Sequence, residues 1–445
     1  MNWFTKFFQS DEECSYQFGR DIAVMNSAKN EVFYKTSEDA FYNKNMLDGC
    51  ENYLKSLILS FDDDESIENK NIEITRHQDS LEFTLIQGSA KVHGTLKEGV
   101  LKAYSIVASS DIHVAIKRRM LERNYQFTYA RFYSENDKIL LKIHLDTSKL
   151  TPTKIFYPLR EIALNSDHEK EFIASEFSKE LLLDIDHIQT MNDEEKKLKY
   201  RYLQKWIQET QSDIEMFPSD ENSSLVAFSY LALLFKIDYL LVPREKFALD
   251  LVKNLTEYFG NEGDSIESKN SKLEKLIIEI KEYSFETFSG MLYPATYTFS
   301  VMEKGSHSDI ELFIEETLKK IRWFKSNRNE RIIVTLYLYM SLYLLYNFAL
   351  HPSMRGLLHI MVQVHMSEFF EELGCSVLYH ASDDNSSENK FSKRDIQDRI
   401  DNSIKPYEKK FPHLKSFSSE LNFNSLESFS QSFFVQLKHL DYSEL

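Results

Sequence analysis

Between Ile72 and Leu145, apolar and polar residues alternate in several short runs, which is the period-two pattern of β-strands with one buried face. The first runs lie at 72–74, 81–85, 90–94 and 100–107. We expect three antiparallel strands from them, joined by short turns. A helix is predicted at 112–124, followed by strands at 127–133 and 138–145. The pattern therefore indicates one curved sheet of five strands, with a helix inserted after the third.

Helical periodicity flanks these strands on both sides. A stripe of apolar residues follows Ser37, which can cap a helix that ends before the acidic stretch "DDDESIENKN". Thr151 and Pro152 fit the cap and first residue of another helix, running to about Phe177. Residues 1–37 are expected to be irregular. The prediction for 38–178 is an α+β domain with an antiparallel sheet and the order α-β-β-β-α-β-β-α.

This order resembles the type III secretion chaperone-like fold, in particular the YbjN-type proteins. The segment that carries the resemblance is "HVAIKRRMLERNYQFTYARFYSENDKILLKIHLDTSKLTPTKIFYPLREIALNSD" (113–167). The resemblance covers about a third of the chain and depends on apolar positions, not on invariant chemistry. It implies an acidic, often dimeric module that holds another polypeptide along its sheet and helices and has no catalytic residues. Members of this class are usually small, whereas a long further stretch follows here.

The rest of the chain, 190–445, has helical periodicity throughout, and we expect an all-helical bundle. Only 11 Gly and 8 Pro occur in 445 residues, which favours long, rarely broken helices. The stretch 332–350 is uncharged over its length and follows several cations, as a membrane span would. Its tyrosines are spread through the middle, however, so a buried helix of the bundle is the preferred interpretation and no membrane span is expected.

Composition limits the function classes. The formal net charge of −17 argues against nucleic acid, because phosphate binding requires a basic face. Cys14, Cys50 and Cys375 are widely spaced, which indicates neither a disulfide framework nor a zinc site. Together with a poor signal-peptide pattern at the N-terminus, this favours a cytoplasmic protein. No cofactor or metal is predicted.

The helix at 112–124 offers a candidate interface. Helical geometry places Ile112, Ile116, Arg119 and Arg123 on one side, whereas Val114 and Leu121 lie opposite. Apolar residues on both sides suggest that something covers the outer side, with Arg118 and Arg119 pairing carboxylates of a partner or of a second copy. The alternative is that the helical domain of the same chain covers it.

A second basic cluster, beside the stretch 332–350, is a candidate anion site. Cations that converge on a helix N-terminus can hold an anion. The alternative is a solvated helix end that balances acidic neighbours such as Glu315 and Glu316. The candidate residues are Arg322, Lys325, Arg328 and Arg331.

No motif assigns a reaction. His351, His359 and His365 are spaced by eight and six residues, which does not place them on one helix face, and "DIDH" (184–187) has no further ligands nearby in the sequence. The leading hypothesis is therefore a non-catalytic adaptor that binds a protein or peptide. The first alternative is a binding protein for a small molecule or anion, or an enzyme, with a pocket in the helical domain near Tyr339, Tyr343 and Tyr346. The second is peripheral membrane attachment through the amphipathic stretch 425–440.

Overall fold

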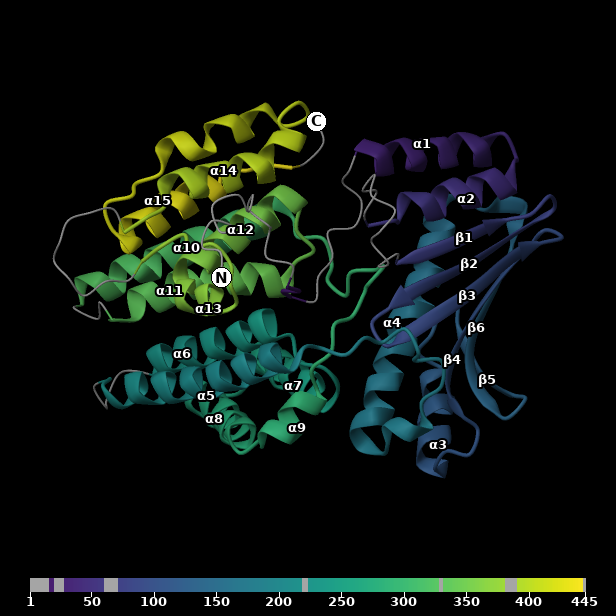
Figure 1. Cartoon of the computed structure of the whole chain (residues 1–445), viewed down its shortest axis with the longest axis horizontal. Coiled ribbons are helices and arrows are strands. Elements are labelled where there is room, and N and C mark those ends of the chain that lie inside the picture. Colours follow the sequence, from purple (N-terminus) through teal and green to yellow (C-terminus); the bar gives the residue numbers. More distant parts are fainter. Residues whose placement is uncertain are drawn as a thin grey trace, which may run out of the picture.

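The computed structural model describes residues 16–19, 28–59, 71–217, 223–327, 331–380 and 390–442. It shows a sheet region formed by the first part of the chain, which lies beside a larger body of helices (Figure 1). The strands form one antiparallel sheet in the order β1-β2-β3-β4-β6-β5. The strands are β1 (Ile72–Arg76), β2 (Ser80–Gln87), β3 (Ala90–Lys97), β4 (Val100–Ser109), β5 (Arg131–Glu135) and β6 (Lys138–Asp146).

The sheet has six strands, so the prediction of five was wrong. Four strands precede the inserted helix α3 (Val114–Arg123), because each of the four alternating runs forms a strand of its own. Tight turns separate the runs. Both turn residues have positive φ at Glu98–Gly99 and at Asn136–Asp137, as the two-residue turns of hairpins require.

Two helices, not one, precede the sheet. The helix α1 (Ala28–Tyr42) begins within the stretch expected to be irregular, and α2 (Met46–Ser56) follows after a short break. At this break Lys44 has a left-handed backbone, and the side chain of Asn45 accepts a hydrogen bond from the Asp48 amide. A residue with left-handed backbone cannot continue an α-helix, so the apolar stripe is divided between two helices.

Helices cover one face of the sheet, which we call the inner face. Leu81, Phe83 and Leu85 point to this face and pack with α2 and the long helix α4 (Pro152–Glu176) in one core. The outer face carries the alternate residues, which are more polar and include Thr84, Lys91, His93 and Tyr104. Period-two alternation thus determines which side chains remain available outside the core.

The chain leaves the sheet region through a gap between strands. β3 and β4 pair from Lys97↔Val100 to His93↔Tyr104 and then separate. Beyond this point, Leu182 forms an isolated bridge with Ala108 of β4. The segment 178–192, which we call the connecting segment, therefore runs alongside the parted strands on its way to the helical body.

A later segment returns to the sheet region. In the strap (residues 293–303), the Thr298 hydroxyl donates to the Ile86 carbonyl at 2.8 Å, and the Phe299 carbonyl accepts from the Gln87 side chain at 3.0 Å. The Phe299 side chain is buried in the core of the sheet region. The two parts of the molecule therefore share side chains from distant parts of the chain.

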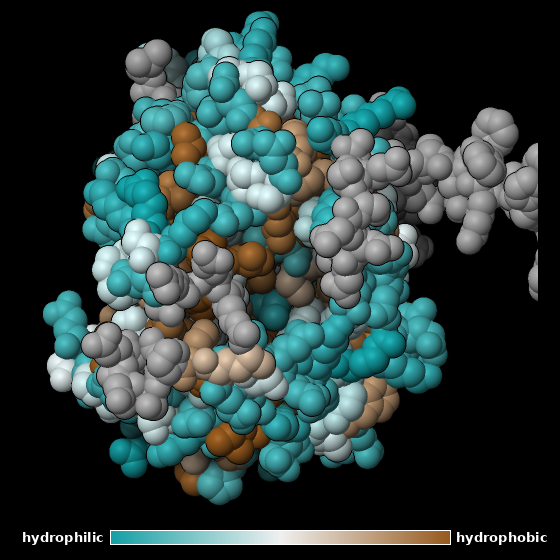
Figure 2. Space-filling view, turned by 90° about the vertical axis from the view of Figure 1, so that its left-hand side faces the viewer, coloured by the Kyte–Doolittle hydropathy of each residue, from teal (hydrophilic) through white to brown (hydrophobic). Residues whose placement is uncertain are grey.

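The helical body has its own large core. The stretch 332–350 contains α11, whose central side chains are buried, in agreement with the buried-helix interpretation. Among the described residues, one helical stretch, Ser223–Leu241, has the length and composition of a membrane span; it consists of α6 and the π-helical turn Ile237–Leu241 that follows it. Of its most apolar 18 residues, 78% are buried, and the core helix of a soluble protein has the same length and composition. Figure 2 shows apolar side chains gathered around a hollow at the far end of this body. The helices are α5 (Asp193–Glu215), α6 (Ser223–Lys236), α7 (Glu245–Gly260), α8 (Ile266–Lys281), α9 (Phe285–Gly290), α10 (His307–Ser326), α11 (Arg331–Asn347), α12 (Pro352–His365), α13 (Ser367–Glu372), α14 (Lys393–Ile404) and α15 (Leu426–Leu437).

Candidate functional site

A cleft of about 1180 Å³ lies where the outer face of the sheet meets the helical body. The connecting segment and the start of α5 line one part of it, and residues 293–296 of the strap line another, together with Tyr16 and Gln17. Side chains of β1, β2 and β3 form its floor. These floor residues are Glu73, Thr84, Ile86, Lys91 and His93.

Strand register brings the floor residues together. Thr84 lies opposite His93, and Ile86 lies opposite Lys91, in the hairpin that turns at Gly88. Because residues two apart on a strand share a face, these four side chains form one patch on the outer face. The cleft therefore has a mainly polar floor, with Ile86 as its apolar member, on regular strands.

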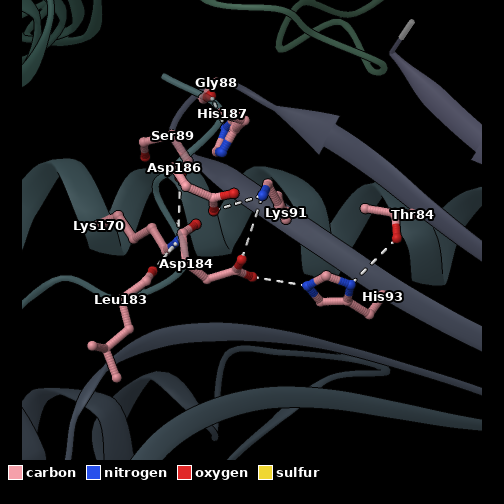
Figure 3. Close-up of polar contacts among 10 residues, drawn as sticks. All are labelled: Thr84, Gly88, Ser89, Lys91, His93, Lys170, Leu183, Asp184, Asp186 and His187. Carbon is pink, nitrogen blue, oxygen red and sulfur yellow. Dashed lines mark hydrogen bonds and ion pairs between the residues drawn. The ribbon is translucent and has the colours of Figure 1, made fainter. Parts of the chain in front are cut away.

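A chain of polar groups crosses this floor (Figure 3). Nε2 of His93 lies 2.8 Å from Oδ2 of Asp184, and Nδ1 of the same ring lies 3.3 Å from Oγ1 of Thr84. Burial tends to raise the pKa of Asp184, but the hydrogen bond from His93 and the nearby positive charges outweigh it and lower this pKa below its usual value. Asp184 is therefore ionised at neutral pH.

Lys91 joins the same carboxylates. Its ammonium nitrogen lies 2.7 Å from Oδ1 of Asp186 and 3.7 Å from Oδ1 of Asp184 (Figure 3). The hydrogen bond from Lys91 lowers the pKa of Asp186. Lys91 thereby ties the connecting segment to β3 and balances part of the negative charge in the cleft.

Lys170 of α4 lies behind this cluster and is buried. Its ammonium group donates to the backbone carbonyls of Ser89, Leu183 and Asp184 at 3.2, 2.7 and 3.0 Å. Burial lowers the pKa of Lys170 to about 8, although the charges of Asp184 and Asp167 oppose this shift. The amine bridges the hairpin and the connecting segment.

The hairpin turn is fixed by a second buried carboxylate. Asp167 accepts hydrogen bonds from the Ser89 amide at 2.6 Å and from the Ser89 hydroxyl at 2.8 Å. Gly88 has a left-handed backbone, and a Cβ atom there would lie 2.2 Å from Oδ2 of Asp167. Burial raises the pKa of Asp167 despite these bonds. Only glycine fits at this corner of the cleft.

His187 contributes an imidazole ring with a fixed tautomer. Its Nε2 lies 3.1 Å from the Gly88 carbonyl oxygen, which can only accept a hydrogen bond, so the proton is on Nε2. Burial lowers the pKa of His187, so the ring is neutral at neutral pH. Its Nδ1 atom is buried and has no hydrogen-bond partner among the residues that the structure describes.

The other side of the cleft is held by polar contacts of its own. Gln17 exchanges two hydrogen bonds with the backbone of Ala295, at 2.8 and 3.1 Å. Lys199 is almost fully buried and pairs with Glu195 at 2.8 Å, and burial lowers the pKa of this lysine. Both lysines that line the cleft, Lys91 and Lys199, are therefore already engaged with carboxylates.

The candidate interface residues divide between two environments. Ile112 and Ile116 are buried in the core of the sheet region. Arg119 forms two hydrogen bonds to the buried carboxylate of Glu169 on α4, at 2.8 and 3.0 Å, and Arg123 also pairs with Glu169. The carboxylate that Arg119 pairs with thus belongs to α4 of the same chain.

The outer side of α3 is exposed. Val114 and Leu121 are 71% and 64% exposed, so the helical domain does not cover them. Arg118 lies at the surface and pairs with Glu122 one helical turn later, at 3.0 Å. An interface at this side of α3 stays a prediction.

Among the candidate anion residues, Lys325 already has an acidic partner. Lys325 pairs with Glu427 at 2.6 Å, and Arg322 is exposed on α10. Arg331 begins α11, and Arg328 lies outside the described residues. The anion site also stays a prediction.

The histidines and tyrosines singled out in the helical part have separate structural roles. His351 caps α12, whereas His359 pairs with the Tyr239 hydroxyl and His365 with Ser430. Tyr339, Tyr343 and Tyr346 pack on Phe235 and do not line the cleft. Within the part of the chain that the structure describes, no group of His, Cys, Asp and Glu side chains could hold a metal ion.

Sequence reasoning missed Thr84, Lys91 and His93. It used the alternation at 81–94 to find strands and passed over the polar positions between the apolar ones. The stretch "DIDH" contains Asp184 and Asp186, but nearly a hundred residues separate these carboxylates from their partners on β3. A signal did exist, because the register of a tight hairpin places Thr84 opposite His93.

Comparison with known proteins adds no relative from which a role could be transferred. No protein-family model matches the chain, and no curated protein matches it.

Proposed function

We propose that the chain is a binding protein that holds an extended polypeptide segment in the cleft. The observation that carries this proposal is the combination of a strand-built floor and a wall formed by residues 188–192, which have no regular secondary structure. The backbone N–H groups of Thr190 and Met191, in that wall, donate to no described residue. Extended peptides are bound through such main-chain groups, with alternate side chains in flanking pockets.

The chemistry of the lining suits a peptide. Ile86, Ile188 and Met191 offer apolar contacts, and Thr84 and Gln189 offer polar ones beside them. Apolar surface with a few fixed polar groups is typical of sites that bind one ligand in one orientation. The resemblance to polypeptide-holding chaperones agrees with this proposal. The cleft adjoins the sheet region, however, and is not confined to the helical domain as the alternative hypothesis expected.

The test uses peptides selected from a random library on the full-length protein. Ile86→Arg places a large cation on the cleft floor. The matched control is Thr95→Arg, which is on the same outer face of the sheet, on β3, but outside the cleft lining. We expect the selected peptides to bind Thr95→Arg like the wild type and Ile86→Arg at least about tenfold more weakly, a loss of about 1.4 kcal/mol. Equal binding to both variants, or no selected peptide, contradicts the proposal.

A second candidate is association of two copies through the outer side of α3. Val114 and Leu121 flank the Arg118–Glu122 pair on this side. Two such helices in antiparallel contact can exchange the ion pair, because the surface carries both charges and is self-complementary. Light scattering on the full chain tests this: Leu121→Glu should convert a dimer to a monomer, and a wild-type monomer at high concentration excludes the dimer.

A further inference from the structure

Three groups in the cleft form a continuous chain from a hydroxyl to a carboxylate. They are Thr84 on β2, His93 on β3 and Asp184 on the connecting segment (Figure 3). Ionised Asp184 can only accept a hydrogen bond, so Nε2 of His93 carries a proton. In the neutral ring, Nδ1 then has a lone pair that faces Oγ1 of Thr84 at 3.3 Å. The order of hydroxyl, imidazole and carboxylate is that of a catalytic triad, with the two ring nitrogens exchanged: here Nδ1 faces the hydroxyl and Nε2 faces the carboxylate.

The His93 ring and Asp184 are held in place by contacts with residues outside this group of three. The backbone carbonyl of Asp184 accepts from Lys170, and its carboxylate faces Lys91. The His93 ring packs against Tyr104 with 5.3 Å between ring centroids. A hydrogen bond between Thr84 and His93 that served only to pair the two strands would require none of these contacts. The supported ring and carboxylate match the preorganisation that a general base requires.

The hydroxyl and the base are also open to a ligand. Thr84 and His93 both line the cleft, whereas Asp184 is only 14% exposed behind them. Lys91 also lines the cleft, and its pairing with Asp186 and Asp184 balances the charge of the carboxylate behind the ring. The order from the cleft inward is therefore that of a hydrolytic site: a hydroxyl that a ligand can reach, an imidazole beside it and a shielded carboxylate behind the imidazole.

We propose that Thr84 is a nucleophile for acyl transfer, with His93 as its base and Asp184 as the residue that positions the ring. Oγ1 of Thr84 attacks a carbonyl carbon of an ester or amide, and its proton passes to Nδ1 of His93. The bond from the carbonyl carbon to the leaving oxygen or nitrogen breaks, and the leaving group takes that proton. Water, activated by His93, then hydrolyses the acyl-threonine and releases a carboxylic acid and free Thr84. No oxidant or cofactor is needed.

The experiment combines turnover with covalent trapping in the full-length protein. The probes are p-nitrophenyl acetate and butyrate for turnover, and a fluorophosphonate and a β-lactone for trapping, with peptide mapping of the adduct. We expect release of p-nitrophenol and one adduct, on Thr84. Thr84→Val keeps the shape without the hydroxyl and should lose the adduct and at least about 100-fold in rate, whereas Thr84→Ser should retain both.

Further variants separate roles. His93→Gln should lower the rate as strongly as Thr84→Val. Asp184→Asn should lower kcat more than it raises KM, because it disturbs the ring and not the binding surface. Thr95→Val, outside the cleft on β3, is the control that should leave the rate unchanged.

Several results would overturn the inference. They are the absence of turnover and adduct with every probe, an adduct elsewhere than Thr84, and an unchanged rate in Thr84→Val or His93→Gln. Thermal melting of each variant shows whether a loss reflects unfolding, and Thr84→Ser remains informative if Thr84→Val fails to fold. Peptide binding without turnover would leave the proposed function standing and remove only the acyl-transfer site.

Discussion

The ammonium nitrogen of Lys170 lies 2.7 Å from the backbone carbonyl oxygen of Leu183, beside the point where β3 and β4 part. Two more carbonyls, of Ser89 and Asp184, accept from the same nitrogen. One buried amine from α4 thus supplies donors to carbonyls of the hairpin turn and of the connecting segment, which lie outside the strands. A side chain, not a neighbouring strand, pairs these main-chain acceptors.

Replacing Lys170 by Met should destabilise the protein, because three buried or partly buried carbonyls lose this donor. We expect the free energy of unfolding in urea to fall by about 2 to 4 kcal/mol. Lys97→Met, on an exposed lysine at the end of β3, is the control and should change it by less than about 0.5 kcal/mol. Equal effects of the two substitutions would show that the Lys170 contacts add nothing to stability.

The lowered pKa of Lys170 gives this prediction a pH dependence. The folded-state pKa is about 8 against an ordinary value of 10.5, so between these values the unfolded chain binds more protons. The unfolding free energy contributed by this group should therefore rise as pH increases from 8 to 10.5. The difference in unfolding free energy between the wild type and Lys170→Met isolates the contribution of Lys170, since the other titrating groups are common to both proteins. A pH-independent difference would contradict the shift.

Gly88→Ala should be severely destabilising. The residue has a φ of +58°, and the added Cβ would lie 2.2 Å from an oxygen of buried Asp167. We expect a loss of at least about 2 kcal/mol in unfolding free energy, and loss of peptide binding at this corner of the cleft. Gly260→Ala is the control, since a Cβ there meets nothing within 4 Å. A Gly88→Ala protein with wild-type stability would show that the turn can move away from Asp167 at no cost in free energy.

Arg119→Ala should cost far more stability than Arg118→Ala. Arg119 forms two hydrogen bonds to the fully buried carboxylate of Glu169, and its guanidinium lies 3.9 Å from the centre of the Phe172 ring. Removing it leaves buried negative charge undercompensated, so we expect a loss of about 3 kcal/mol. Arg118 is 82% exposed and should change stability by less than about 0.5 kcal/mol. Calorimetric melting of both variants checks the ranking.

Local patterns were sufficient for much of the fold. Period-two alternation located most of the strands, although the strand predicted at 127–133 begins only at Arg131 and ends at Glu135. Helical spacing separated the side of α3 with Ile116 and Arg119 from the side with Val114 and Leu121. The number of strands was wrong because the run at 72–74 is short, and only its pairing with β2 shows that it forms a strand. The break between α1 and α2 depends on one left-handed residue, Lys44, for which apolar spacing gives no signal.

The cleft could not be predicted because its parts meet only in three dimensions. Lys91 and Asp186 form an ion pair although they are far apart in the sequence. Gln17 likewise forms a hydrogen bond with the distant residue Ala295. Burial of Glu169 likewise depends on the packing of α4 against the sheet. Such contacts follow from tertiary arrangement, which neither residue spacing nor composition specifies.

The strap has a consequence for biosynthesis. A ribosome releases the strands before the strap, yet the core of the sheet region includes Phe299, and its hairpin is bonded to Thr298. The nascent sheet region therefore lacks part of its interior until the strap has been translated. We expect its final consolidation to wait for synthesis of α5 to α9, which lie between α4 and the strap in the sequence.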